Sequence, residues 1–404
     1  MKKIITSCAL PLALSAFSAH AVNQEIRALF QPDPAQPSKN TFVNKTPNSG
    51  FCVVYPAQCA DSNMFSIEVP VRYTSHRNLI PGDGVTVQVP ANWRRLTVTN
   101  QDTGQSEVVE VRITGVGSTF HLSERVQDLT GIDDTFQAHD RLWTSDGWLY
   151  PPAPCRNSPV SGVGEKTYRF FWHTPLEAMC LKRVALPIPA MWFEKLDFSY
   201  ELKTPNPMGM SSGLYSGSIS YSMGPGGDFH LGYMMYPDDS NLTLDFVLDV
   251  QHTLKVDLPP GGNNVTLEPE GGWRPWIESG RKPTKIFRDQ PFFISASSRF
   301  KVMLLCSSPG GNFCKLGSPQ GNWSDFQVSM TLPPGITQSD GSNVTRVPLR
   351  FNNWIGPFEP GLYVDRKPGV IHFDMTSYAI NFLLKPGLND RLRGNVTIIW
   401  DSEA

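Results

Sequence analysis

Apolar residues alternate with polar ones along much of this chain. From Leu242 to Leu258 they occupy every second position, and only His252 interrupts the series. A period of two places these side chains on one face of an extended chain, so the segment is predicted to form one long half-buried strand or two consecutive strands. His252 is alone on the apolar face and is expected to be a hydrogen-bonded structural residue rather than a ligand.

Shorter alternating segments predict further strands, at residues 65–69, 85–89, 96–99, 108–113 and 326–332. Helical signals are few. Thr174 to Glu177 supplies an N-cap, an N1 proline and a capping-box glutamate for one short helix, and residues 123–129 are a second candidate. Short strands separated by turn sequences predict an all-β protein built from β-sandwiches.

The composition agrees with this class. Glycine and proline together make up about 17% of the 404 residues, against roughly 12% in average proteins, and both break helices. Aromatic residues at 11% exclude a disordered polyelectrolyte, and the formal net charge of −2 gives a nucleic-acid partner no electrostatic support. The length suggests two to three domains.

The first 21 residues have the form of a signal peptide. Lys2 and Lys3 precede an apolar run from Ile4 to Phe17, and Ala19-His20-Ala21 has the small-x-small form of a cleavage site. The run is too short to span a bilayer, and no later segment approaches the roughly 20 continuous apolar residues that a membrane helix needs. The mature chain is therefore predicted to be exported and released.

Export changes the interpretation of the cysteines. Without Cys8 in the signal peptide, six cysteines remain, an even number in three close pairs, which are Cys52 with Cys59, Cys155 with Cys180 and Cys306 with Cys314. Six cysteines allow fifteen connectivities, and local pairing is the simplest expectation in an oxidising compartment. Their spacings do not fit a zinc site, and no metal is expected.

An internal similarity suggests a domain boundary. Residues 214–221 and 391–398 both place a glycine before a strand-like alternation. Because the second copy closes the chain, the first is expected to close an earlier domain, and Gly224 to Gly227 is a candidate linker. The mature chain is accordingly divided into residues 22–223 and 228–404.

The closing sequence, Leu392 to Trp400, resembles the last strand of chaperone–usher fimbrial subunits, which reads Gly-x-Tyr-x-Gly-x-hydrophobic-x-hydrophobic. Gly213 to Tyr221 is the closer match, because the terminal copy has Asp390 for the first glycine and Leu392 for the tyrosine. A two-domain subunit of this family resembles a tip adhesin, exported through the periplasm to the fimbrial tip on the cell surface.

The resemblance implies that residues 228–404 form an incomplete immunoglobulin-like pilin domain that lacks its last strand. A periplasmic fimbrial chaperone would fill the open groove first, and a strand of the adjacent fimbrial subunit would replace it at the outer-membrane usher. Val396, Ile398 and Trp400 are expected to line this donor-strand groove, although ordinary core packing in a complete sandwich stays open. Pro32, Pro34 and Pro37 make residues 22–46 a poor donor strand, which favours a tip subunit.

Receptor binding is then expected in residues 22–223, with a host glycan or protein as the receptor. Trp143, Asp146, Trp148 and Tyr150 form the densest aromatic stretch of the chain, beside loop-forming Asp-Gly and Pro-Pro sequences. Their rings are candidates for stacking on a sugar, with the carboxylate accepting hydrogen bonds from hydroxyl groups. The alternative is that the two tryptophans fill a core.

Catalytic signatures are weak. Gly209 to Gly213 satisfies G-x-S-x-G, but prolines precede it and a strand-like sequence follows, so it is expected to be a turn and not a nucleophile elbow. No enzymatic activity and no cofactor are expected. The alternative function is a stand-alone secreted module, β-rich, that binds or acts on glycans.

Overall fold

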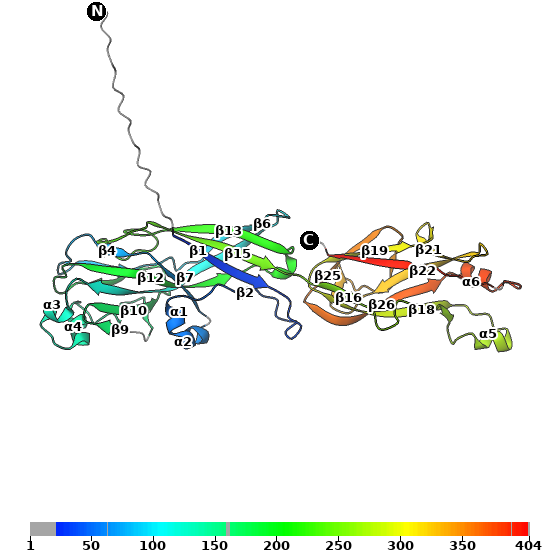
Figure 1. Cartoon of the computed structure of the whole chain (residues 1–404), viewed down its shortest axis with the longest axis horizontal. Coiled ribbons are helices and arrows are strands. Elements are labelled where there is room, and N and C mark those ends of the chain that lie inside the picture. Colours follow the sequence, from blue (N-terminus) through cyan, green and yellow to red (C-terminus); the bar gives the residue numbers. More distant parts are fainter. Residues whose placement is uncertain (1–21, 63, 159–161, 389, 403–404) are drawn as a thin grey trace, which may run out of the picture.

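The computed structural model describes residues 22–62, 64–158, 162–388 and 390–402, so the expected signal peptide lies outside the described residues. Strands dominate, as the alternation predicted, and the protein is all-β in class. Figure 1 shows the strands gathered in two lobes that lie end to end. We call residues 22–250 the first lobe and residues 254–402 the second lobe, because no sheet contains strands of both.

One large sheet and one small sheet make up the first lobe. The small sheet pairs β5 (Gly84–Val87) with β11 (Cys180–Arg183). The large sheet contains β1 (Val22–Phe30), β2 (Val43–Asn44), β3 (Phe65–Val69), β4 (Tyr73–Ser75), β6 (Arg94–Asn100), β7 (Ser106–Leu122), β8 (Arg156–Asn157), β9 (Gly162–Gly164), β10 (Thr167–His173), β12 (Met191–Lys203), β13 (Gly213–Ser222), β14 (Met235–Pro237) and β15 (Asn241–Val250).

Strand β15 belongs to the first lobe. Its alternate residues, from Leu242 to Val250, are buried in the core of that lobe. It pairs along its whole length with β13, antiparallel, and with β1, parallel. The expected domain boundary at 223/228 is therefore corrected, since a short return after β13 brings β15 back beside it. Gly224 to Gly227 forms a turn within the lobe, and the change of sheet falls at residues 251–253.

Two sheets share the core of the second lobe. The larger contains β16 (Leu254–Asp257), β17 (Glu268–Pro269), β18 (Ile286–Ala296), β20 (Pro309–Gly310), β21 (Phe313–Gly317), β22 (Trp323–Thr331), β24 (Val347–Leu349) and β26 (Val364–Met375). The smaller has the order β23 (Ile336–Gln338), β25 (Trp354–Pro360), β19 (Phe300–Cys306) and β27 (Val396–Ser402). Inward-facing residues of both sheets form one apolar cluster.

Helices are short and peripheral. They are α1 (Phe51–Val54), α2 (Pro56–Asp61), α3 (Val126–Thr130), α4 (Thr135–Arg141), α5 (Arg274–Ser279), α6 (Ser377–Leu383) and a 3-10 turn at Pro207–Gly209. The predicted helix at 123–129 overlaps α3, but the one at 174–177 is wrong, because residues 175–178 form bends shortly before Cys180. No helix in the described part of the chain is long and apolar enough to cross a membrane.

The six cysteines pair locally, as predicted. The disulfides join Cys52 to Cys59, Cys155 to Cys180 and Cys306 to Cys314. Two lie in the first lobe and one in the second, so neither lobe is covalently cross-linked to the other by them. In the oxidising compartment expected from the leader sequence, these bonds restrict the unfolded states of each lobe separately.

His252 lies in the link between the lobes and is a structural residue, as predicted. Its Nε2 is 2.8 Å from the backbone oxygen of Met210 in the first lobe, and its Nδ1 is 3.1 Å from Oγ of Ser297 in the second. Both ring nitrogens are thus hydrogen-bonded, and burial lowers the pKa of the imidazole. The side chain ties the two lobes together at the linker.

Candidate functional site

The C-terminal strand β27 lies at the edge of its sheet. It pairs with β19 from Val396, opposite Cys306, to Ser402, opposite Phe300. Among the described strands, none pairs with its other side. A row of backbone N–H and C=O groups on that side is therefore exposed for pairing with another chain. We call this side of β27 the open edge. Figure 1 shows β27 in red, running back toward the first lobe.

The apolar face of β27 consists of the alternating residues that the sequence predicted. Val396, Ile398 and Trp400 all pack against the core of the second lobe. The Trp400 ring lies 5.2 Å from that of Phe292 on β18 and 5.8 Å from that of Phe300 on β19, measured between centroids. The tryptophan therefore contacts both sheets.

These residues are less buried than their neighbours on the same sheet. Val302 and Leu304, which pair with Trp400 and Ile398, are 0% and 1% exposed, whereas the β27 residues are only partly buried. A complete sheet would cover an inward-facing strand residue from both sides. The contrast indicates that apolar surface stays uncovered along the open edge.

The other sheet also ends in an edge strand here. Strand β16 pairs only with β18, and its Leu254 and Val256 are partly buried against the same core. Trp400 of β27 packs on Phe292 of β18, the strand that pairs with β16.

Trp143 and Trp148, predicted to bind a receptor, lie instead in the core of the first lobe. They are 3% and 1% exposed. The Trp148 ring stacks on Trp172 at 4.8 Å and lies 5.5 Å from Phe120. A buried ring cannot stack on a ligand, so the receptor role expected of these two residues is corrected to core packing.

Asp146 and Tyr150 are exposed on the loop that contains the two tryptophans. The buried Lys182 holds the backbone of this loop in place. The lysine is 1% exposed, and its Nζ donates to the backbone oxygens of Ser145, Asp146, Gly147 and Tyr150 at 2.6–3.1 Å. Burial lowers the pKa of Lys182 to about 8. The loop is therefore fixed by a buried side chain, and its exposed residues Asp146 and Tyr150 stay candidates for receptor binding.

A polar pocket of about 150 Å³ opens on the outer face of the large sheet. Its lining comes from β3, β7, β10 and β12 and consists of Glu68, Ser118, Thr119, Arg169, Glu194, Lys195 and Asp197. A β-bulge between Phe193 and Leu196 inserts one extra residue into β12 at this place. Such bulges redirect side chains, and here the bulge turns both Glu194 and Lys195 outward.

Ion pairs hold the charged groups of the pocket in place. Arg169 Nη2 donates to Asp197 Oδ2 at 2.7 Å, and Lys195 Nζ donates to Glu68 Oε1 at 2.9 Å. The Asp197 side chain is only 3% exposed. Gly50, whose φ of 66° suits glycine, allows the chain before α1 to pass directly over it, because a Cβ there would overlap the carboxylate.

Two carboxylates face each other across this pocket. Asp197 on β12 and Glu68 on β3 are direct partners in the ladder. Burial raises the pKa of Asp197 to about 6, the Glu68 carboxylate adds to the rise, and the Arg169 guanidinium opposes it. Like charges directly opposite each other destabilise a sheet. Strongly perturbed carboxyl groups in a hollow are typical of functional sites.

Replacing Asp197 by asparagine is expected to remove a pH dependence of stability. The folded chain keeps the Asp197 proton up to a pH of about 6, whereas an unfolded chain releases it at about pH 4. Between these values the folded state binds more protons, so the free energy of unfolding falls as pH rises, by about 2–3 kcal/mol. Urea denaturation at a series of pH values should show this fall in the wild type and not in Asp197→Asn.

The exposed Asp102→Asn is the control for this substitution, and its pH profile should match that of the wild type. Identical profiles for the wild type and Asp197→Asn would contradict the proposed titration.

Sequence patterns did not indicate the pocket. Glu68, Arg169 and Asp197 each occupy a polar position in an alternating strand, where solvent-facing residues are ordinary. Only the pairing of three distant strands brings them together, and the bulge in β12 has no glycine or proline to announce it. The only feature of the sequence that could have indicated the pocket is the group of charged residues Glu194, Lys195 and Asp197 within an otherwise apolar strand.

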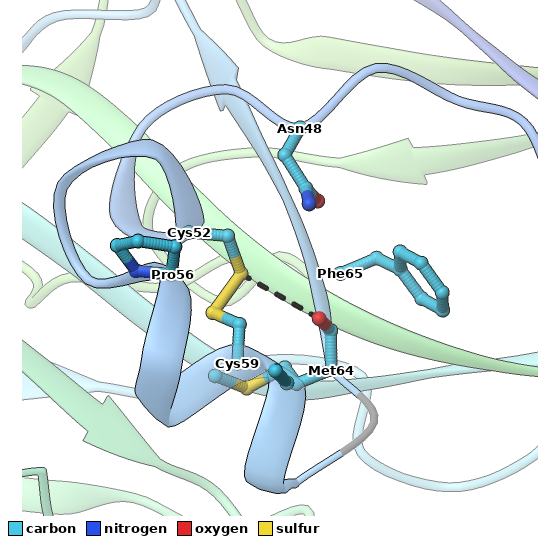
Figure 2. A pocket seen from close by; sticks show the side chains of 7 residues that line it. Asn48, Cys52, Pro56, Cys59, Met64 and Phe65 are labelled. Atoms are coloured by element: carbon cyan, nitrogen blue, oxygen red, sulfur yellow. Dashed lines mark hydrogen bonds between the residues drawn. A yellow bond between two sulfur atoms is a disulfide. The ribbon is translucent and has the colours of Figure 1, made fainter.

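A second cavity, of about 180 Å³, lies beside the first disulfide. Asn48, Cys52, Pro56, Cys59, Ala60, Met64 and Phe65 line it. In Figure 2 the disulfide forms one wall, and Cys52 Sγ lies 3.6 Å from the backbone oxygen of Met64. Its lining contains no charged residue, so it offers little acid–base chemistry. In the described part of the chain, no group of three or more His, Cys, Asp or Glu side chains is placed to hold a metal ion.

Comparison of the sequence with known protein families finds no match, and comparison with curated proteins finds none. Among solved structures, the chain is similar to a chaperone–tip adhesin complex of CFA/I fimbriae, with 10% identity, 95% of this chain and 97% of that chain covered and a TM-score of 0.28. The chain is also similar to CfaE, the adhesive subunit of CFA/I fimbria of enterotoxigenic Escherichia coli. The identity is 10%, 95% of this chain and 95% of that chain are covered, and the TM-score is 0.27.

The CsuC–CsuE chaperone–tip adhesion subunit complex of Acinetobacter baumannii gives 9% identity, 94% and 98% coverage and a TM-score of 0.21. These matches extend over nearly the whole chain. Their TM-scores are too low for the likeness to carry an argument about this protein, whose assignment rests on its own residues.

Proposed function

We propose that this protein is the tip adhesin of a chaperone–usher fimbria and has no enzymatic activity. The second lobe accepts a donated strand at the open edge, first from a periplasmic chaperone and then from the adjacent subunit at the outer-membrane usher. The first lobe attaches the fimbria to a host glycan or protein. The single observation that carries the proposal is the unpaired side of β27, with partly exposed Val396, Ile398 and Trp400.

Strand addition at this edge would satisfy two needs at once. An incoming strand supplies hydrogen-bond partners for the backbone of β27, and its alternate side chains cover the apolar residues of β27 and β16. Proteins rarely leave such an edge exposed, because it is a template for aggregation. A partner that covers it until assembly is therefore part of the proposed function.

The N-terminal segment supports an acceptor that does not donate. Residues Val22–Phe30 form β1, and all nine pair with β15 in the first lobe. The prolines that follow, at positions 32, 34 and 37, lie outside strands. A segment already paired within its own lobe is not available to complete a neighbouring subunit, which fits a position at the tip.

The motif that carries the family resemblance occurs in two different settings. The closer match, Gly213–Ser222, is β13, which has strands on both sides within the large sheet. The more divergent copy precedes and enters β27, which has a strand on one side only. The acceptor role is therefore assigned to the terminal copy.

Co-expression in a bacterial periplasm with a chaperone of this class tests the proposal. We expect a one-to-one complex that protects the protein from aggregation. Ile398→Lys should abolish the complex, because the charge would lie on the face that a donated strand covers. Ile399→Lys is the matched control, one residue along on the opposite face of β27, and should keep it. A soluble monomer that ignores the chaperone would instead favour a stand-alone secreted module.

A further inference from the structure

The polar pocket of the first lobe combines features that a folded sheet does not need for its stability. It places Glu68 directly opposite Asp197, and it leaves the Asp197 side chain only 3% exposed beneath the segment that precedes α1. A nearly buried ion pair is weak evidence of stabilisation, since its desolvation offsets most of the attraction. Departures of this kind from local rules are typical of functional sites.

The remaining carboxylate of the pocket, Glu194, contacts a histidine of the neighbouring strand. Glu194 Oε2 lies 3.0 Å from Nε2 of His121, and the His121 ring stacks on Trp192 at 5.3 Å with an angle of 7° between the rings. The guanidinium of Arg72 lies 4.9 Å from the Trp192 ring. The stacked His121 ring thus gives Glu194, whose side chain is 60% exposed, a neighbouring contact.

The charges indicate what kind of ligand fits. The pocket contains three carboxylates and two cationic groups, and both cations are already paired with carboxylates. An anionic ligand would meet excess negative charge, and an apolar one would leave the polar lining without partners. A neutral ligand with several hydroxyl groups can donate to the carboxylate oxygens while it accepts from Arg169, Lys195 or Thr119.

We propose that this pocket binds one neutral pyranose ring of a glycan. Neighbouring hydroxyls of such a ring donate and accept hydrogen bonds from adjacent positions, which matches the alternating acidic and basic groups. The volume of about 150 Å³ is smaller than the roughly 300–1,000 Å³ of sites for larger ligands, so a single ring enters. The inference rests on the proposed role of the first lobe in attachment and assigns that role to a site.

The test uses the mature chain, with a fused C-terminal strand if this is needed to keep it monomeric. Methyl α-mannopyranoside, methyl α-glucopyranoside and methyl β-galactopyranoside are titrated separately by ligand-observed NMR and calorimetry. The methyl glycoside of N-acetylneuraminic acid serves as the anionic comparison. We expect one of the three hexopyranosides to bind with a Kd of about 1 mM, which is weak binding, and the anionic sugar not to bind.

Matched variants locate the binding. Lys195→Met and Thr119→Val are expected to weaken it at least tenfold. Lys203→Met is the control for the first, because it is also on β12, paired with a glutamate and 55% exposed against 52% for Lys195. Thr97→Val on β6 is the control for the second. Both controls should bind as the wild type does.

Three results would overturn the inference: no hexopyranoside binds, the anionic sugar binds more tightly, or pocket and control variants behave alike. If a donated strand still completes the second lobe while no hexopyranoside binds, only the pocket assignment fails. If a hexopyranoside binds but the second lobe needs no strand, the pocket stands and the fimbrial proposal fails.

Discussion

A donated strand fused to the C-terminus is expected to convert the mature chain from an aggregating protein into a monomer that melts cooperatively. The added strand, taken from the N-terminal extension of the adjacent subunit, would follow β27 through a flexible linker and fold back along the open edge. It would supply ladder hydrogen bonds to β27 and cover Val396, Ile398 and Trp400, which are partly exposed without it. Size-exclusion chromatography and differential scanning calorimetry measure both effects.

A scrambled fusion controls for length and composition. It has the same residues in an order that breaks the period of two, so it cannot place its apolar side chains on one face. We expect it to leave the chain aggregated. If the unfused chain is already monomeric and melts at the same temperature as the fused one, the open edge needs no partner and the strand-acceptor role is wrong.

Replacing Trp148 by alanine is expected to lower the free energy of unfolding of the first lobe by about 3–5 kcal/mol. The ring is 1% exposed and packs between Trp172 and Phe170 at centroid distances of 4.8 and 4.4 Å. Its removal would leave a cavity that a close-packed sheet cannot fill. Calorimetry of the mature chain should show the transition of the first lobe at a markedly lower temperature.

Tyr150→Ala is the matched control, because this side chain is on the same loop and is 53% exposed. Its unfolding free energy should stay within about 0.5 kcal/mol of the wild type. A Trp148→Ala variant that melts like the wild type but loses attachment would instead return the loop to the receptor-binding role first predicted for it.

The alternation of apolar residues was sufficient to predict the class of the fold and several strands. Residues 65–69 form β3 with the predicted bounds, and the long alternation after Leu242 becomes β15 and β16, separated at His252. Alternation gives the inward face of a strand but not its partner. Because β15 returns to pair with β13 and β1, the domain boundary inferred from local similarity was misplaced.

Because alternation does not reveal which strands pair, only some of the candidate site residues could be predicted from the sequence. The inward face of β27 followed from period two alone, and Val396, Ile398 and Trp400 do pack against the core, while their role in a donor-strand groove stays a prediction. The sequence of an aromatic loop does not show whether its rings point into the core or toward solvent. The Trp148 ring points into the core, where Phe120 and Trp172 from other strands pack against it. Asp197 and Glu68 are 129 residues apart in sequence and meet only through strand pairing.

Strand β15 leads directly into the three-residue link at 251–253, and this has a mechanical consequence. Tension applied between the lobes pulls β15 along its own axis, which Figure 1 shows running toward the second lobe. The strand is held by nine partners in β1 on one side and ten in β13 on the other. Such a pull loads both ladders in shear, so many backbone hydrogen bonds must break together instead of peeling apart one by one. The link between the two lobes is therefore attached to the first lobe by a strand that resists being pulled along its axis.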